Sequence, residues 1–334
     1  MMAFVWFILA AAVTVFAAIK LSNYADVLST KTAMGGLLVG TLLLAGATSL
    51  PEVTTSISAV LIDNPDIAIG NVVGSNMFNL FIFACFDLFY RKNHLLEQAG
   101  RSHLYTAGTG FVLMAITYLS LTFHPGWSVL GVGLDAIVLV LIYAAGMVIV
   151  GRVSRNLSGE PAAPAHDLAE ETATGNEDVT VRRAIIGFSL AALLIMGAGT
   201  VLSIMGDRIA VITGLGSSFV GSFLIAATTS LPEAVSVYVA LKFRNVNLAL
   251  GGILGSNMFN MLIIFLADLF YRDGPVLSAG DPSHRITALV VLALSAVILF
   301  ALARRRTKSN FSYALPSALI IVGYFVASYL MFQG

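Results

Sequence analysis

Apolar stretches of about 20 residues recur along this chain from its first residues to its last, the length that a helix needs to cross the core of a bilayer. Only 11% of the 334 residues are charged, against roughly 25% in soluble domains. The chain therefore lacks the groups that would cover a water-facing surface. These features predict an all-α polytopic membrane protein.

Ten membrane spans can be placed on the apolar stretches. They cover residues 3–19, 34–60, 66–90, 104–123, 128–151, 184–205, 211–241, 247–271, 284–303 and 311–332. The second and seventh spans are longer than a straight crossing requires, and each has a proline in its middle. We expect these two helices to be broken or tilted.

The basic residues predict the orientation of the spans. If the N-terminus is outside, 15 of the 18 Lys and Arg residues lie at the inner side and 3 at the outer side. Such a bias favours a topology with both termini outside. We expect the protein to lie in the plasma (inner) membrane. No basic residue precedes the first apolar run, which favours a first span over a cleaved signal peptide.

Five spans per half is an odd number, so the second half must enter the membrane in the opposite orientation. The predicted fold is therefore ten transmembrane helices arranged as two inverted five-helix repeats, residues 1–151 and 184–334. Residues 152–183 are polar and without apolar periodicity, and we interpret them as a cytoplasmic linker. The acidic residues of this linker lack the spacing of a calcium-binding loop.

A stretch of 52 residues occurs twice, at residues 40–91 and 221–272, and 24 of these positions are identical without a gap. The identities gather in TSLPE, GSNMFN and DLFYR. A shared fold would preserve apolarity but would not require the same Ser, Glu and Asn residues twice. Inverted repeats with interrupted hydrophobic segments at matching positions indicate the midplane binding site of a transporter.

Glu52 and Glu233 lie in the middle of long apolar spans, where a carboxylate costs at least about 2.5 kcal/mol and usually has a function. A proline precedes each of them, which opens the helix and leaves the carbonyls of Ala47 and Thr228 without a donor. Free carbonyls inside a membrane must line a cavity or bind a ligand. Ser49 lies in the same turn as Glu52, and Ser230 lies in the same turn as Glu233.

GSNMFN adds amide and hydroxyl oxygens on one helix face in each half. For Asn76 and Asn257, hydrogen bonding between helices is as good an explanation as ion binding. Gly70 and Gly74, like their counterparts in the second half, should allow close helix approach. A set of hard oxygen donors without His or Cys suits Ca²⁺ or Na⁺ better than Zn²⁺. Two facing carboxylates repel each other without a cation, so protons could compete.

TSLPE and GSNMFN, present twice in halves of five spans, resemble the alpha repeats of the cation/calcium exchanger superfamily, in particular its prokaryotic sodium/calcium exchanger branch. The resemblance covers the whole ten-span plan. It implies secondary active antiport of Ca²⁺ against Na⁺ by alternating access, with the first and sixth spans sliding over a core that holds the ions. No cofactor is implied, because both ions are substrates.

The resemblance also implies the metal ligands. Carried over by motif position, they are Glu52, Glu233, Thr48, Thr229, Ser49, Ser230, Ala45, Ala226, Ser75, Ser256, Asn79 and Asn260. Several relatives have an Asp where this chain has Asn260, so the site here has two carboxylates and not three. This difference argues against a K⁺-dependent subtype.

Other functions remain open from the residues alone. The same ligands would suit a H⁺-coupled Ca²⁺ exchanger, or an exchanger of Mn²⁺ or Mg²⁺. An intramembrane protease would need a base, and all five His residues fall in loops or at span ends. A channel usually needs a ring of like residues. We expect no enzyme activity, no nucleic acid and no obligatory protein partner besides the lipid bilayer.

Three aspartates and one cysteine lie outside these motifs. Asp87 and Asp268 each precede an Arg by four residues, which predicts an ion pair at a helix end. Asp135 has no counterpart in the other half, and we interpret it as a structural hydrogen-bonding group. Cys85 is expected to be a small core residue.

Overall fold

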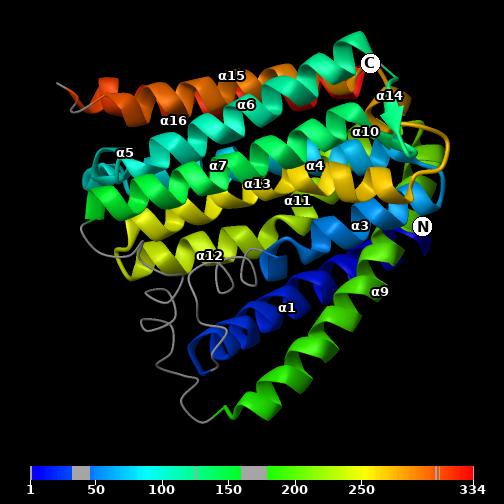
Figure 1. Ribbon diagram of the computed structural model, residues 1–334, viewed down its shortest axis with the longest axis horizontal. Helices are drawn as coiled ribbons and strands as arrows, with labels where there is room; N and C mark the ends of the chain where they lie inside the picture. Colours follow the sequence, from blue (N-terminus) through cyan, green and yellow to red (C-terminus); the bar gives the residue numbers. More distant parts are fainter. Residues whose placement is uncertain are drawn as a thin grey trace.

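The structure is a computed structural model that describes residues 2–31, 46–124, 126–158, 179–304, 307 and 309–333. Long helices run along one axis of the molecule, and the two chain ends lie at the same end of this bundle (Figure 1). The helices of the first half are α1 (Met2–Lys31), α3 (Leu50–Leu61), α4 (Pro65–Phe89), η1 (Arg91–Asn93), α5 (Leu95–Gln98), α6 (Ser102–Phe123) and α7 (Leu134–Ser158).

The helices of the second half are α9 (Val181–Thr213), α10 (Ser217–Phe219), η3 (Val220–Ile225), α11 (Ala226–Thr229), α12 (Leu231–Lys242), α13 (Val246–Phe270), α14 (Val276–Ala279), α15 (His284–Ala303) and α16 (Asn310–Gln333). The segment η3 is a π-helix. Two short strands, β1 (Ser128–Val129) and β2 (Val132–Gly133), form an antiparallel hairpin before α7.

Eight of the described helices are long and apolar enough to cross a membrane, and a ninth candidate is formed by residues 217–229 and 231–242 with a bend of 40° between them. The bend confirms that the seventh predicted span is broken. The second predicted span lies partly outside the described residues, so the count of ten stays a prediction.

Three predicted boundaries were wrong. The fifth span begins at Leu134 and not at 128, because residues 128–133 form the hairpin. The helices α1 and α9 extend well beyond the predicted 3–19 and 184–205. Their extra turns contain polar residues that apolarity alone excludes from a span.

The same turn starts both central helices. Asn64 caps α4 by accepting a hydrogen bond from the N–H of Ile67, and Asn245 caps α13 through Leu248, each at 3.1 Å. The preceding residues, Asp63 and Arg244, adopt left-handed conformations with φ of 60° and 59°. A side-chain oxygen at the N-cap satisfies one of the amides that a helix start leaves unpaired. The duplicated sequence thus builds equivalent helix starts.

The helices α4 and α13 form the centre of the bundle and are the most buried of the candidate spans. The long helices α1 and α9 pack along each other at an angle to the rest (Figure 1). Small side chains such as Ala17, Ala18 and Ala191 lie in their shared core. Close packing of small residues takes the place of hydrophobic burial when the surroundings are lipid.

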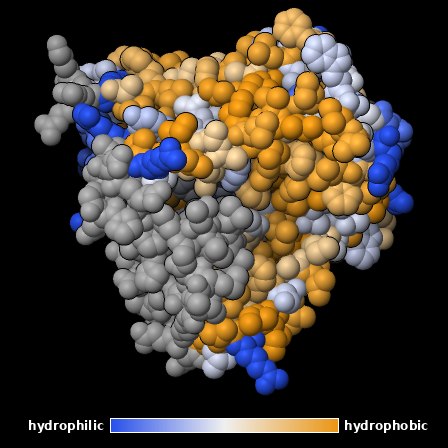
Figure 2. Space-filling view, in the orientation of Figure 1, coloured by the Kyte–Doolittle hydropathy of each residue, from blue (hydrophilic) through white to orange (hydrophobic). Residues whose placement is uncertain are grey.

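The visible face of the molecule is mainly hydrophobic in its middle, and its hydrophilic side chains gather toward the ends (Figure 2). Exposed aromatic side chains include Trp6, Phe16 and Phe325. The small, cap-like elements α5 and α14 lie at opposite ends of the bundle (Figure 1). An apolar band between polar ends is the surface that a bilayer requires.

Candidate cation site

Both TSLPE motifs break their helices at the same residue. Ser49 has φ −91° and ψ 9°, and Ser230 has φ −89° and ψ 4°, and a new helix begins at the next residue in each half. Pro51 and Pro232 fall in the first turn of these helices, where a missing N–H costs no hydrogen bond. The predicted opening of the helices at the prolines is confirmed.

The break also determines the electrostatic setting of the glutamates. Glu52 and Glu233 lie in the first turns of α3 and α12. The N-terminus of a helix carries a partial positive charge and unpaired N–H groups, which stabilise a nearby anion. Each proline therefore places a carboxylate at a favourable position inside the membrane.

Hydroxyl groups of the second half surround Glu52, which is 1% exposed. Ser230 Oγ donates to Glu52 Oε1 at 3.2 Å, and Thr229 is a second hydrogen-bond partner. Thr229 Oγ1 also lies 3.5 Å from Ser75 Oγ. The structure thus brings together residues of both motifs and both halves.

Glu233 is 4% exposed and has Ser256 as a hydrogen-bond partner. The two half-sites therefore differ in detail, because Glu52 takes its hydroxyls from the opposite half and Glu233 from its own. Ser49, the counterpart of Ser230, has no partner for its hydroxyl among the described residues.

Five buried oxygens of the candidate site lack a hydrogen-bond partner among the described residues. They are Ser49 Oγ, Glu52 Oε2, Glu233 Oε2, Asn79 Oδ1 and Asn260 Oδ1. Buried polar atoms are normally paired, so unpaired acceptors in both repeated motifs are candidates for binding a cation. The described part of the chain holds no group of three or more His, Cys, Asp or Glu side chains, so the candidate site combines only two carboxylates with hydroxyl and amide oxygens.

The remaining candidate ligands, Ala226, Thr48 and Ala45, lie in or just before the TSLPE motifs. Ala226 is fully buried, and its carbonyl accepts from Ser230 N at 3.0 Å and from Thr229 Oγ1 at 3.3 Å. Thr48 is half-buried just before the break, and Ala45 lies outside the described residues.

Asn71 lies in the candidate site, although the sequence analysis did not single it out. It is fully buried, donates to the carbonyl of Glu52 at 3.2 Å and accepts from Thr229 Oγ1 at 3.1 Å. Its repeat counterpart is Gly252, so a search for duplicated polar residues passes over it. Asn71 lies one turn before GSNMFN on the same helix, and this position is the feature of the sequence that could have identified it.

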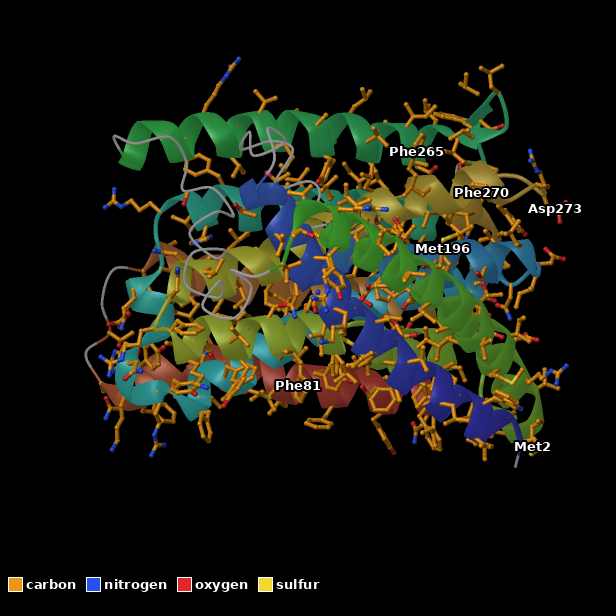
Figure 3. All side chains as sticks on the ribbon, turned by 90° about the horizontal axis from the view of Figure 1, so that it is seen from below. Met2, Phe81, Met196, Phe265, Phe270 and Asp273 are labelled. Atoms are coloured by element: carbon orange, nitrogen blue, oxygen red, sulfur yellow. The ribbon has the colours of Figure 1, made fainter. Side chains whose placement is uncertain are left out.

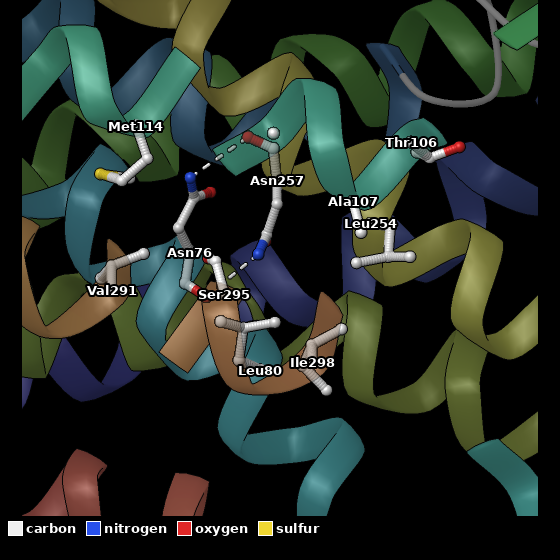
Figure 4. A pocket seen from close by; sticks show the side chains of 11 residues that line it. Asn76, Leu80, Thr106, Ala107, Met114, Leu254, Asn257, Val291, Ser295 and Ile298 are labelled. Atoms are coloured by element: carbon white, nitrogen blue, oxygen red, sulfur yellow. Dashed lines mark hydrogen bonds between the residues drawn. The ribbon is translucent and has the colours of Figure 1, made fainter. Parts of the chain in front are cut away.

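Asn76 and Asn257 hold the two central helices together. Asn76 Nδ2 donates to the carbonyl of Asn257, and Asn257 Nδ2 donates to the carbonyl of Asn76, both at 3.2 Å (Figure 4). Of the two explanations that the sequence left open, the structure supports hydrogen bonding between helices. The side-chain oxygens of both residues are also occupied, by Asn79 and Asn260.

Glycine brings α4 against the π-helix that precedes the second break. A Cβ atom at Gly74 would lie 2.2 Å from the carbonyl oxygen of Ser222, and one at Gly70 would lie 2.9 Å from its nitrogen. The predicted close approach is confirmed for these two glycines. It positions Ser75 beside the second TSLPE motif.

The predicted ion pairs of Asp87 and Asp268 with the arginines four residues later were wrong. Asp87 accepts from Tyr313 Oη and, at 2.6 Å, from Ser317 Oγ. Asp268 accepts from the backbone N–H groups of Gly133 at 2.6 Å and Val276 at 2.5 Å. Both aspartates are buried. The partners of Asp87 belong to α16, and those of Asp268 belong to β2 and the start of α14.

Asp135 hydrogen-bonds the N–H of Ala136 at 2.8 Å, as expected of a structural group at a helix start.

Comparison with known proteins identifies the family of this chain. The family described as "Sodium/calcium exchanger protein" matches residues 2–152 and again residues 183–333. The inner membrane protein YrbG of Escherichia coli is 24% identical over 302 residues, covering 88% of this chain and 86% of its own.

Two solved structures share the fold. The H⁺/Ca²⁺ exchanger CAX has a TM-score of 0.68 at 16% identity, covering 99% of this chain and 86% of its own. The sodium-calcium exchanger NCX_Mj has a TM-score of 0.57 at 15% identity, covering 98% of this chain and 97% of its own. The chain is therefore a multi-pass membrane protein of the sodium/calcium exchanger family, a family of transporters and not of enzymes.

Proposed function

We propose that this protein is a secondary active antiporter that exchanges Ca²⁺ for Na⁺ at a site between its two halves. The observation that carries the proposal is the pair of buried glutamates at duplicated helix breaks, each with hydroxyl partners and with one carboxylate oxygen that has no partner among the described residues. Ca²⁺ takes 6–8 oxygen ligands in a flexible shell of carboxylates, carbonyls and amides. Two carboxylates balance one Ca²⁺ or two Na⁺, which allows both ions to compete for one site.

The proposed ligands are the twelve residues inferred from the sequence, and their proximity supports part of this set. Ser230 and Thr229 contact Glu52, and Ser256 contacts Glu233. The oxygens of these hydroxyl groups are neutral ligands that suit Na⁺ once Ca²⁺ has left the site.

Alternating access would follow from the duplicated architecture. The elements α5 and α14 occupy equivalent positions 181 residues apart and lie at opposite ends of the bundle (Figure 1). This placement supports two inverted repeats of five spans each, 1–151 and 184–334. We further propose that both termini are outside and the 152–183 linker is cytoplasmic, in the inner membrane where YrbG is named to lie.

A H⁺-coupled Ca²⁺ exchanger is the second candidate, and two observations favour it. Each glutamate keeps one oxygen without a partner among the described residues, where a proton could replace a cation. The fold also resembles that of a H⁺/Ca²⁺ exchanger.

Uptake of radiolabelled Ca²⁺ into liposomes containing the purified protein distinguishes the two candidates. We expect uptake only when the liposomes are loaded with Na⁺, and none with K⁺. Uptake driven by a pH gradient without Na⁺ would refute the sodium-coupled function and support the proton-coupled one. Repeating the assay with Mn²⁺ and Mg²⁺ measures selectivity.

A further inference from the structure

We propose that Asn76 and Asn257 orient the amide groups of Asn79 and Asn260, so that oxygens and not NH₂ groups face the cation site. The inference rests on the proposed function and deepens it. Asn76 and Asn257 would thus control the affinity for the cation without binding it, because their own side-chain atoms form hydrogen bonds within the protein.

An asparagine ligand has an orientation problem that a carboxylate lacks. Its amide carries an oxygen acceptor on one side and two N–H donors on the other, in nearly the same shape. Only the oxygen binds a cation, and half a turn of the amide would present the NH₂ group instead. A site that relies on asparagine therefore needs a group that determines this orientation.

The hydrogen bonds supply such a group for each amide. Asn79 Nδ2 donates to Asn257 Oδ1, and Asn260 Nδ2 donates to Asn76 Oδ1, each at 2.9 Å. The NH₂ group of each candidate ligand thus has a partner from the other central helix. The opposite side of each amide, its Oδ1, has no partner among the described residues although both side chains are 1% exposed.

The orienting residues are themselves held in place. Asn76 and Asn257 donate to each other's backbone carbonyl, as the reciprocal bonds in Figure 4 show. A reversed amide at Asn76 would place two NH₂ groups, its own and that of Asn260, against each other. The orientation is therefore determined by the packing of α4 on α13 before any cation binds.

Cohesion between helices alone does not account for this arrangement. A network that served only to join α4 and α13 would satisfy all its polar atoms. An unpaired buried acceptor is destabilising, and here two acceptors without a partner among the described residues lie at repeat-equivalent positions of one network. They are explained if a cation uses both oxygens.

The first test replaces the orienting residue by one of similar size that cannot hydrogen-bond. We expect N257L, and independently N76L, to raise the Ca²⁺ concentration for half-maximal uptake by about tenfold or more, which corresponds to about 1.4 kcal/mol. The maximal rate should fall less. The control N247L removes hydrogen bonds to Gly100 and His103 at the exposed start of the same helix α13, and should leave this concentration unchanged.

The second test separates orientation from packing. A carboxylate has two equivalent oxygens, and in N79D it would be repelled by Asn257 Oδ1. In the N79D background, N257L should therefore be neutral or beneficial. An equal loss in both backgrounds would overturn the proposal, and so would unchanged half-saturation in folded N76L and N257L.

A measurement of cation binding separates the failure of this proposal from the failure of the proposed antiport function. The melting temperature of the detergent-solubilised full-length protein is measured with Ca²⁺ and, separately, with Na⁺. Cation-dependent stabilisation without exchange refutes the antiporter, while the variant comparison still tests the orientation. A wild-type protein that neither cation stabilises refutes both proposals. The melting temperature without cations reports whether each variant folds.

Discussion

Glu52 and Glu233 each occupy the first turn of a helix that begins inside an apolar span, and neither is more than 4% exposed. Their negative charge is the part of the candidate site that no other described residue replaces, because Asn260 is neutral. We expect E52Q and E233Q each to abolish Ca²⁺ exchange, since glutamine keeps the shape but removes the charge. Radiolabelled Ca²⁺ uptake measures the loss.

Elution of both variants as a single species in size-exclusion chromatography would confirm that they fold. The control D273N removes a carboxylate from an exposed loop at the end of the molecule that also holds Met2 (Figure 3), and should transport normally. Near-normal exchange in either glutamine variant would contradict the two-glutamate site.

The contact between α4 and η3 depends on Gly74. A Cβ atom there would lie 2.2 Å from the backbone oxygen of Ser222 and 2.5 Å from its Cα, and backbone atoms cannot rotate away. We expect G74A to lower stability by about 1–3 kcal/mol, the usual cost of overpacking, and to reduce transport. Heat denaturation monitored by circular dichroism measures the loss of stability.

G252A is the matched control for this contact, because it adds the same methyl group at an exposed position on α13 with no described atom within 4 Å. Its stability should stay within about 0.5 kcal/mol of the wild type. If G74A were as stable as G252A, the close approach of the two segments would not be required.

The whole molecule presents repeat-equivalent loops at opposite ends. Lys92 and Asp273 are exposed residues 181 positions apart, in the segments that precede α5 and α14. With Cys85 replaced by serine, we expect D273C to react with a membrane-impermeant thiol reagent in intact cells. K92C should react only after permeabilisation, because the basic residues favour the inner side for its loop.

The converse pattern, with K92C labelled in intact cells, would show that the orientation is reversed. Labelling of both variants from the same side would refute the inverted repeat itself. An immunoblot would establish that both variants reach the membrane.

Local sequence was enough to predict most of the helices and both breaks. The apolar runs, Pro51 and Pro232 act within a few residues, through burial and a missing N–H, so their effect does not depend on distant partners. The hairpin at residues 128–133 was missed because its Val and Gly residues fit a span equally well. The partners of Asp87 were missed because Tyr313 and Ser317 are more than 200 residues away in the chain.

The sequence alone determined that the chain is a helical membrane protein with two glutamates at duplicated breaks, because chain length, apolarity and proline act locally. Only the tertiary structure decided which buried oxygens have no partner among the described residues. The Oδ1 atoms of Asn79 and Asn260 are buried and unpaired there because Asn257 and Asn76 on the opposite helix bind the NH₂ groups. The hydrogen bond from Ser230 to Glu52 likewise depends on the tertiary structure, because it joins the two halves of the chain and forms only when they pack together.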